Sequence, residues 1–246
     1  MTANTPVNPH QQPVIHRYID QTAWVRACST IIVQALHADL RSSRNVLLLL
    51  SGGFTPIPIF HALAEADLPW PQITVSLVDE RIIAAGQPGR NADLLSEHLF
   101  TGAAAKARFW PLLDTDLDPT HAAYDASQRL AGESLPISVV VLGMGGDGHT
   151  ASLFPGASNL DAALTSPAPY IAVDATGCPG AGSWPHRVSL TPTGFGMAQR
   201  RLLLLTGTHK LAVFEQACSK YTDARQAPVR TTWETSGTAL AVHWHP

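Results

Sequence analysis

The chain has 246 residues, of which 45% are hydrophobic and 14% are charged. Its 16 basic and 19 acidic residues give a net charge of −3 without a basic block, which argues against a nucleic-acid-binding protein. The low charge does not fit a disordered chain, and the longest apolar runs, about five residues, are too short to span a membrane. The composition therefore predicts a soluble, compact protein.

Cysteine usage and the N-terminus indicate the compartment. Cys28, Cys178 and Cys218 are widely spaced and form no C-x-x-C pair for a metal or redox site. The N-terminus has neither the basic nor the apolar segment of a secretion signal. We therefore expect a cytoplasmic protein in which residues 1–19 form a loose tail and residues 20–246 form a single α/β domain.

Helical and strand-like segments alternate along the chain. The first predicted helix begins after Asp20, a suitable N-cap, and carries apolar residues at three- and four-residue steps. Strands are expected at the short apolar runs 46–50, 73–78, 137–142 and 202–205, and more weakly at 171–173 and 239–242. Further helices are expected at 58–66, 92–100, 119–130 and 210–220. This alternation predicts a doubly wound, mostly parallel, Rossmann-like α/β sheet with helices on both faces.

Each of the four stronger strands leads into a glycine-rich or polar loop. The loops are 51–56 (SGGFTP), 79–81 (DER), 143–149 (GMGGDGH) and 206–210 (TGTHK). Because ligands of open α/β sheets bind beyond the carboxyl ends of the strands, we expect all four loops to meet at one edge. A further loop, 174–185, is rich in glycine and proline and is either a lid or a surface excursion.

The first of these loops has the chemistry of an anion site. Gly52 and Gly53 allow the backbone to approach an anion closely, and the following helix offers free N–H groups. The hydroxyls of Ser51 and Thr55 can add two more donors. The G-x-x-x-x-G-K-[ST] pattern of a Walker loop is absent, and an ordinary tight turn is the alternative interpretation.

The third loop combines a carboxylate with an imidazole. Its glycines match the G-x-G-x-x-G fingerprint by letter, but Pro155 cuts any following helix after about six residues, so we reject a nicotinamide site. Asp147 and His149 suit general-base catalysis, because a nearby carboxylate fixes the tautomer of a histidine and raises its basicity.

Three cations stand out in a chain that is poor in charge. Arg81, which follows Asp79 and Glu80, either forms a surface ion pair or holds an anionic substrate or oxyanion, oriented by the carboxylates. Arg187 and Lys210 are further candidates for binding the same anion.

Metal and nucleophile chemistry are poorly supported. His243 and His245 share one face of the last predicted strand, where we expect them to face solvent rather than bind a metal. No metal-ligand spacing occurs elsewhere, and no G-x-S-x-G elbow is present. The reaction should therefore use water or a proton transfer, with no metal and no cofactor.

Together these motifs resemble those of the 6-phosphogluconolactonase family. The run 142–156 (LGMGGDGHTASLFPG) is similar to the family signature, 51–56 to its Gly-Gly-Ser-Thr-Pro loop, and 79–81 to its Asp-Glu-Arg. The segments 185–191 (PHRVSLT) and 206–210 resemble its later motifs. The resemblance covers residues 20–244 in order, and it implies the fold of the glucosamine-6-phosphate isomerase superfamily.

The resemblance also implies a reaction, the hydrolysis of 6-phosphoglucono-1,5-lactone to 6-phosphogluconate in the oxidative pentose phosphate pathway. His149 would be the general base that activates water, Asp147 would orient it, and Arg81 would stabilise substrate charge or the oxyanion. The residues that bind the substrate and its phosphate would be Ser51, Gly52, Gly53, Thr55, Asp79, Arg187 and Lys210. We expect a monomer or small homo-oligomer.

Two departures and two alternatives stay open at this point. Phe54 replaces the family's small serine, and in the stretch 82–91 only Asn91 is shared with the family. A glucosamine-6-phosphate deaminase or isomerase would need a glutamate downstream of the histidine, where this chain has 152–155 (SLFP). A non-catalytic sugar-phosphate sensor would usually carry a DNA-binding extension, for which residues 1–19 are too short.

Overall fold

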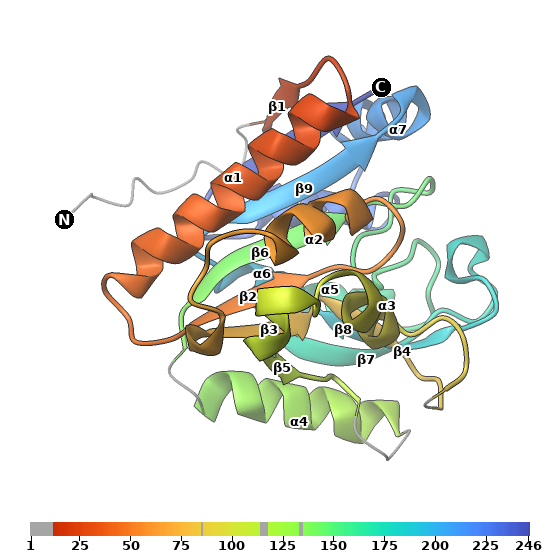
Figure 1. Ribbon diagram of the computed structural model, residues 1–246. Coiled ribbons are helices and arrows are strands. Elements are labelled where there is room, and N and C mark those ends of the chain that lie inside the picture. Colours follow the sequence, from red (N-terminus) through yellow and green to blue (C-terminus); the bar gives the residue numbers. More distant parts are fainter. Residues whose placement is uncertain (1–11, 85, 114–117, 133–134) are drawn as a thin grey trace.

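The computed structural model describes residues 12–84, 86–113, 118–132 and 135–246 (Figure 1). Within these ranges, seven parallel strands form the main sheet, in the order β1-β10-β9-β6-β2-β3-β5. Their bounds are β1 (Val14–Arg17), β2 (Val46–Leu50), β3 (Ile73–Leu77), β5 (Arg108–Trp110), β6 (Ile137–Gly143), β9 (Arg201–Thr206) and β10 (Leu240–His245). A second, antiparallel sheet has the order β4-β8-β7, with β4 (Asp79–Arg81), β7 (Tyr170–Asp174) and β8 (His186–Leu190).

The central strands form where the sequence is continuously apolar. Every residue of β2 and β3 is buried, as expected for strands that are covered on both faces. Strand β2 pairs with β3 on one side and with β6 on the other. The strands and the helices that cover them share one cluster of buried apolar side chains.

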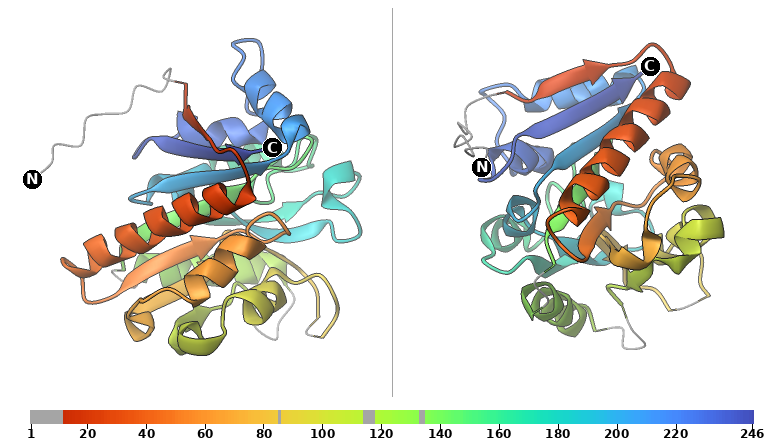
Figure 2. Two further views of the ribbon diagram at one scale, coloured as in Figure 1. Left: turned by 45° about the horizontal axis from the view of Figure 1, so that its top comes forward. Right: turned by 60° about the vertical axis from the view of Figure 1, so that its left-hand side comes forward.

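The helices lie on both faces of the main sheet. They are α1 (Gln21–Leu40), α2 (Ile57–Ala64), α3 (Asn91–His98), α4 (Pro119–Gly132), α5 (Leu160–Thr165), α6 (Pro192–Gly196), α7 (Thr208–Ala217) and α8 (Thr231–Glu234). Short 3₁₀ turns occur at Trp70–Gln72, Gly102–Lys106, Pro179–Ala181 and Pro228–Arg230. Crossovers through α1, α2 and α3 run one way along the sheet, and those through α4 and α7 run the other way. Right-handed crossovers therefore place the two groups on opposite faces (Figure 2).

Helix α1 shows how local sequence defines an element. Asp20 has extended backbone angles, and its carboxylate accepts a hydrogen bond from Ala23 N at 2.7 Å, which confirms the predicted N-cap. The buried stripe includes Trp24 and Cys28, and the Trp24 indole donates to the His243 carbonyl of β10 at 3.0 Å. No helix in the described part of the chain is both long enough and apolar enough to cross a membrane.

The order of the strands fixes where a ligand can bind. From β2 the chain moves toward β3, whereas from β6 it moves toward β9, so the winding direction reverses between these adjacent strands. Such a reversal leaves a crevice at the carboxyl ends of the two strands. The loops that follow β2 and β6 are the two glycine-rich loops singled out in the sequence.

The doubly wound, mostly parallel sheet and its four stronger strands are confirmed, but three details were wrong. Of the expected tail, residues 1–11 lie outside the described residues, and Val14–Arg17 form strand β1, paired with β10. Residues Asp79–Arg81, expected as a loop, form strand β4, and the weak strand at 171–173 belongs with β4 to the second sheet. His243 and His245, expected to face solvent, are buried under α1 and β1.

Candidate active site

A cleft of about 330 Å³ opens at the carboxyl ends of β2, β6 and β9. Nine of the ten predicted site residues line it, from all four loops and from β8. They are Ser51, Gly52, Gly53, Thr55, Asp79, Arg81, His149, Arg187 and Lys210. Asp147, the tenth, contacts His149 from outside the lining. The expected convergence of the loops is therefore observed.

His149 and Asp147 form a tight pair in the loop after β6. Nδ1 of His149 lies 2.6 Å from Oδ1 of Asp147, which also accepts the His149 backbone N–H at 3.1 Å. Burial by itself raises the pKa of Asp147, but the hydrogen bonds and the charge of His149 outweigh it and hold that pKa below its ordinary value. An ionised carboxylate only accepts hydrogen bonds, so Nδ1 carries a proton, and in the neutral form of the imidazole Nε2 keeps a lone pair that can accept a proton.

The loop around this pair is held in place by its own contacts. Gly145 N donates to the His149 carbonyl at 2.9 Å, and a Cβ on Gly145 would lie 2.1 Å from Cε1 of the imidazole, so only glycine fits there. Thr150 Oγ1 donates to the Gly143 carbonyl at 2.9 Å. The Phe154 ring packs against the His149 ring with 4.3 Å between centroids. The imidazole is therefore held by the Asp147 carboxylate at Nδ1 and by the ring of Phe154.

The loop after β2 is the opposite case, because its polar groups lack partners. Within the described ranges, no hydrogen bond is made by the backbone N–H groups of Gly52, Gly53, Phe54 and Thr55. Ser51 Oγ is buried in the cleft, also without a partner among the described residues. Gly53 adopts a φ of 86°, which turns the chain into α2. We call residues 51–55 the anion cradle, since these residues, with their four N–H groups and two hydroxyls, line one cleft at the N-terminus of α2.

Lys210 and Arg81 bring positive charge to the cleft. Lys210 lies in the first turn of α7, and no described residue forms an ion pair or hydrogen bond with its ammonium. Burial lowers the pKa of Lys210, as expected for a cation that lacks an anion. The Arg81 guanidinium donates to the Gly89 carbonyl, while its Nε is buried without a partner among the described residues.

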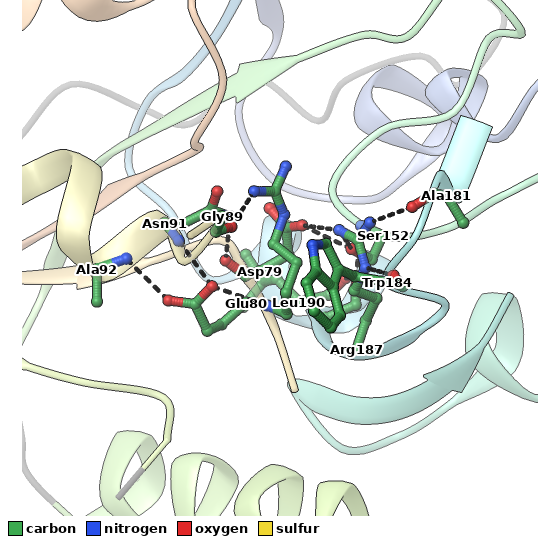
Figure 3. Close-up of polar contacts among 12 residues, drawn as sticks. Asp79, Glu80, Gly89, Asn91, Ala92, Ser152, Ala181, Trp184, Arg187 and Leu190 are labelled. Atoms are coloured by element: carbon green, nitrogen blue, oxygen red, sulfur yellow. Dashed lines mark hydrogen bonds and ion pairs between the residues drawn. The ribbon is translucent and has the colours of Figure 1, made fainter. Parts of the chain in front are cut away.

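Arg187 differs from these two cations because the protein already binds it (Figure 3). It is only 5% exposed, and its guanidinium donates to the carbonyls of Trp184 and Ala181 and to Ser152 Oγ. Nη1 lies 3.7 Å from Oδ2 of Asp79, and that oxygen also accepts a hydrogen bond from Ser152 Oγ at 2.6 Å. Burial lowers the pKa of Arg187, and Asp79 partly offsets that shift. Asp79 therefore orients Arg187, not Arg81 as the sequence suggested.

Glu80 is a buried carboxylate with a structural task (Figure 3). It accepts hydrogen bonds from the backbone N–H groups of Arg81, Asn91 and Ala92, each at 2.8 Å, and so joins strand β4 to the start of α3. Desolvation raises the pKa of Glu80 despite these hydrogen bonds. Asn91, the one family residue kept in that stretch, lines the cleft and donates to the Asp79 carbonyl at 2.8 Å.

Three residues near the reactive pair were not predicted as part of the site. Ser152 and Phe154 lie within the run 142–156, whose motif does not reveal that Ser152 donates to Asp79 or that Phe154 packs on His149. Gly180 lies in the loop 174–185, which the sequence could describe only as a lid or an excursion. The loop lies over the site, since a Cβ on Gly180 would be 2.3 Å from Oδ2 of Asp147.

Among the described residues, no group of three or more His, Cys, Asp or Glu side chains is arranged so that it could hold a metal ion. His243 and His245 instead pack among aromatic rings, with His16 and Tyr18 stacked on His243 and Trp24 tilted against His245. Burial lowers the pKa of His243 to about 4, which keeps it neutral near physiological pH.

The fold and the cleft define a class, the doubly wound α/β proteins that hold a histidine–carboxylate pair beside an anion cradle at the switch point of the sheet. The chain belongs to the family of glucosamine-6-phosphate isomerases and 6-phosphogluconolactonases, whose family model matches residues 19–243. The resemblance that the motifs suggested is thereby confirmed.

Individual relatives are similar over nearly the whole chain. The 6-phosphogluconolactonase of Xylella fastidiosa is 41% identical over 227 residues, which cover 92% of this chain and 94% of the relative. The 6-phosphogluconolactonase of Pseudomonas aeruginosa is 37% identical over 222 residues, 90% of each chain. A crystal structure of a 6-phosphogluconolactonase from Shewanella baltica matches with a TM-score of 0.88 at 29% identity, covering 96% of this chain and 99% of that one.

Proposed function

We propose that this protein is a 6-phosphogluconolactonase, which hydrolyses 6-phosphoglucono-1,5-lactone to 6-phosphogluconate. The observation that carries the proposal is the placement of His149, whose Nδ1 is held by Asp147 and whose Nε2 has no hydrogen-bond partner among the described residues, in the cleft that also contains the anion cradle. The names of the curated relatives support the same reaction, because they cover nearly the full length of this chain.

The chemistry needs one base and one positive charge. Nε2 of His149 takes a proton from water as the water oxygen bonds to the lactone carbonyl carbon, and the carbonyl oxygen becomes an oxyanion near Arg81. The intermediate then breaks its bond to the ring oxygen, which takes the proton back from the imidazolium, and the product is an open-chain carboxylic acid that ionises. General-base catalysis contributes about 10²–10⁴-fold, and charge stabilisation of the oxyanion about 10²–10³-fold. No covalent enzyme intermediate is required, since a sugar lactone is an activated ester.

The phosphate of the substrate would bind in the anion cradle. Four backbone N–H groups, the hydroxyls of Ser51 and Thr55, and the ammonium of Lys210 can satisfy its oxygens. Arg187 adds positive charge to the cleft from a buried position, and Asp79 borders the space where a sugar hydroxyl can donate to a carboxylate. Arg81 stays with the reacting carbonyl, as the motif comparison implied.

The alternative deaminase chemistry lacks a residue that it needs. It requires a carboxylate downstream of the histidine, and in that segment Ser152 is bonded to Asp79 while Phe154 packs on the imidazole. No contact among the described residues favours that chemistry or a non-catalytic sensor, and a single assay distinguishes both from a lactonase.

A coupled assay tests the proposal. Freshly generated 6-phosphogluconolactone is supplied to the protein, and 6-phosphogluconate is detected by its dehydrogenase as NADPH forms above the spontaneous rate. A parallel reaction with glucosamine 6-phosphate is assayed for ammonia. We expect activity only with the lactone. Ammonia release would replace the proposal with the deaminase, and binding of both compounds without turnover would indicate a sensor.

The proposal also covers the cofactor requirement, oligomeric state and location of the enzyme. We propose a metal- and cofactor-free enzyme that works as a monomer or small homo-oligomer, with residues 20–246 acting as one catalytic unit. A cytoplasmic location is supported by the three cysteines, all of them free thiols. Dialysis against EDTA should leave the activity intact, and loss restored by a divalent ion would contradict the metal-free mechanism.

A further inference from the structure

Arg187 was expected to bind the substrate phosphate, yet its contacts point elsewhere (Figure 3). Nε donates to the Trp184 carbonyl at 2.5 Å, Nη2 to the Ala181 carbonyl at 2.9 Å, and Nη1 to Ser152 Oγ at 3.4 Å. All three nitrogens of the guanidinium are therefore engaged by the protein. Lys210 lines the same cleft and has no hydrogen-bond or ion-pair partner among the described residues, so its ammonium, unlike the Arg187 guanidinium, is available to a ligand.

Two of the three contacts of Arg187 go to one loop. Residues 175–185 join the antiparallel strands β7 and β8, and Ala175 N closes the base of this loop by donating to the Pro185 carbonyl at 3.0 Å. Ala181 and Trp184 lie between those ends. Because Arg187 is on β8 and is also held by Ser152 and Asp79, it ties the far part of the loop to the floor of the cleft. A flat guanidinium with several donors suits this task, since it can bind separate carbonyls at fixed angles.

The part of the loop that Arg187 fixes touches the reactive pair. Gly180 is adjacent to Ala181 and lines the cleft. A Cβ on Gly180 would lie 2.3 Å from Oδ2 of Asp147 and 3.1 Å from Nδ1 of His149. Oδ1 of Asp147 bonds His149, so the loop backbone packs against the other carboxylate oxygen. The Asp147 carboxylate is thus confined between the imidazole and the loop.

We propose that Arg187 is a positioning residue, which fixes the loop 175–185 against Asp147 and so holds His149 in its working geometry, and that it does not bind the phosphate. The role refines the proposed lactonase function and rests on it. Small displacements of a catalytic group are costly, since a shift of about 1 Å can reduce the rate by about 10²-fold. Loss of Arg187 should therefore lower kcat, whereas loss of a phosphate ligand would raise KM.

Two substitutions of Arg187 separate these roles. Arg187→Lys keeps the charge but loses the fork of donors, and Arg187→Met loses both. We expect both variants to show kcat lowered about 10- to 100-fold and KM within about 3-fold of the wild type. A phosphate ligand would instead give an increase in KM for Arg187→Met that Arg187→Lys largely restores, and this result would overturn the proposal.

Gly180→Ala tests the contact between the loop 175–185 and Asp147 while Arg187 stays intact. The three atoms nearest to the added methyl group belong to the side chains of Asp147 and His149 and not to backbone, so the fold should persist while the Asp147 carboxylate is displaced. We expect kcat to fall about 10-fold with KM unchanged, even if the Arg187 variants fail to fold. The control is Ser183→Ala, since Ser183 is exposed in the same loop and its side chain has no hydrogen bond among the described residues. Wild-type kcat in Gly180→Ala would contradict the proposal.

Hydrogen exchange separates failure of this role from failure of the lactonase function. The backbone amides of 175–185 should exchange faster in Arg187→Met than in wild type or Ser183→Ala, and the ring signals of His149 in NMR spectra should shift. These readouts need no turnover, so a wild-type protein without lactonase activity would refute the function while the positioning contact is still tested. Unchanged exchange and an unchanged His149 signal in Arg187→Met would refute the contact itself.

Discussion

The loops after β6 and β2 follow adjacent strands and border the same cleft, yet they differ in whether their polar groups have hydrogen-bond partners within the protein. In the loop after β6, the Asp147 carboxylate, the His149 imidazole and the nearby backbone groups bond one another. In the anion cradle after β2, no described residue accepts a hydrogen bond from the backbone N–H groups of residues 52–55 or forms one with the buried Ser51 hydroxyl. In the proposed mechanism, the protein therefore completes the geometry of the base itself, and the substrate phosphate supplies the missing hydrogen-bond partners of the cradle.

This contrast predicts that substitutions in the two loops will change different kinetic parameters. A change near His149 should reduce the chemical step and leave binding intact. A change in the cradle or at Lys210 should weaken binding in the ground state and the transition state alike, which raises KM and leaves kcat nearly unchanged.

The largest effect is expected from His149→Ala. Removal of the base should lower kcat about 10³-fold while the product 6-phosphogluconate still binds, because the cradle is untouched. Stopped-flow proton release, corrected for spontaneous hydrolysis, measures the rate, and calorimetry measures product binding. His37→Ala, at an exposed position on α1, is the control. A rate near that of the wild type would remove His149 from the mechanism.

Asp147→Asn should come next, with kcat lowered about 10²-fold. The amide retains the shape of the carboxylate but not its charge, so it no longer stabilises the imidazolium or fixes the proton on Nδ1. The same stopped-flow assay applies, with KM measured alongside. If KM rose while kcat stayed unchanged, Asp147 would have to contact the substrate. The assignment of catalysis to the loop after β6 and of binding to the cradle would then be wrong.

Lys210→Ala should raise KM about 10-fold and change kcat less than about 3-fold, since a phosphate contact persists through the reaction. Lys220→Ala is the matched control, because Lys220 is exposed and lies against Tyr221 instead of the cleft. Steady-state kinetics at several ionic strengths provide the measurement. A fall in kcat with KM unchanged would place the ammonium at the reacting carbonyl.

The smallest effects concern two buried serines. Ser51→Ala removes a hydroxyl that has no partner among the described residues, so the free energy of unfolding should stay within about 0.5 kcal/mol of the wild type while KM rises a few-fold. Ser152→Ala removes the hydroxyl that donates to Asp79, and it should cost about 1–3 kcal/mol of stability. Urea unfolding of both variants tests the contrast. Equal losses of stability would mean that the Ser51 hydroxyl is satisfied in the free protein.

Much of the site was predictable because its residues follow continuous apolar strands. The runs 46–50 and 137–142 could be read as buried strands, and the winding of such a sheet brings the ends of its strands together. The residue types in the loops then limited the chemistry. Glycines beside a helix start indicate an anion, and a carboxylate two residues from a histidine indicates a base.

What the sequence could not indicate depends on contacts with distant backbone. Strand β1 has only four residues and exposes Val14, so it lacks the apolar pattern of a buried strand. Strand β4 is a short charged segment, and only antiparallel pairing with β8, far along the chain, makes it a strand. The partners of Arg187 in the loop 175–185 are backbone carbonyl oxygens, which the residue types of the loop do not reveal. His243 and His245 were misjudged because imidazoles suit both water and an aromatic core.

The place of β10 in the main sheet has a consequence for how the chain folds during synthesis. Strand β10 lies between β1 and β9, and Val14 pairs with Ala241, so the first described strand has no neighbour until the residues near 240 leave the ribosome. Helix α1 also contacts β10, so part of its apolar stripe stays uncovered during that time. A nascent chain that stops before residue 240 therefore exposes an unpaired strand and a bare helix face, the kind of surface that chaperones recognise.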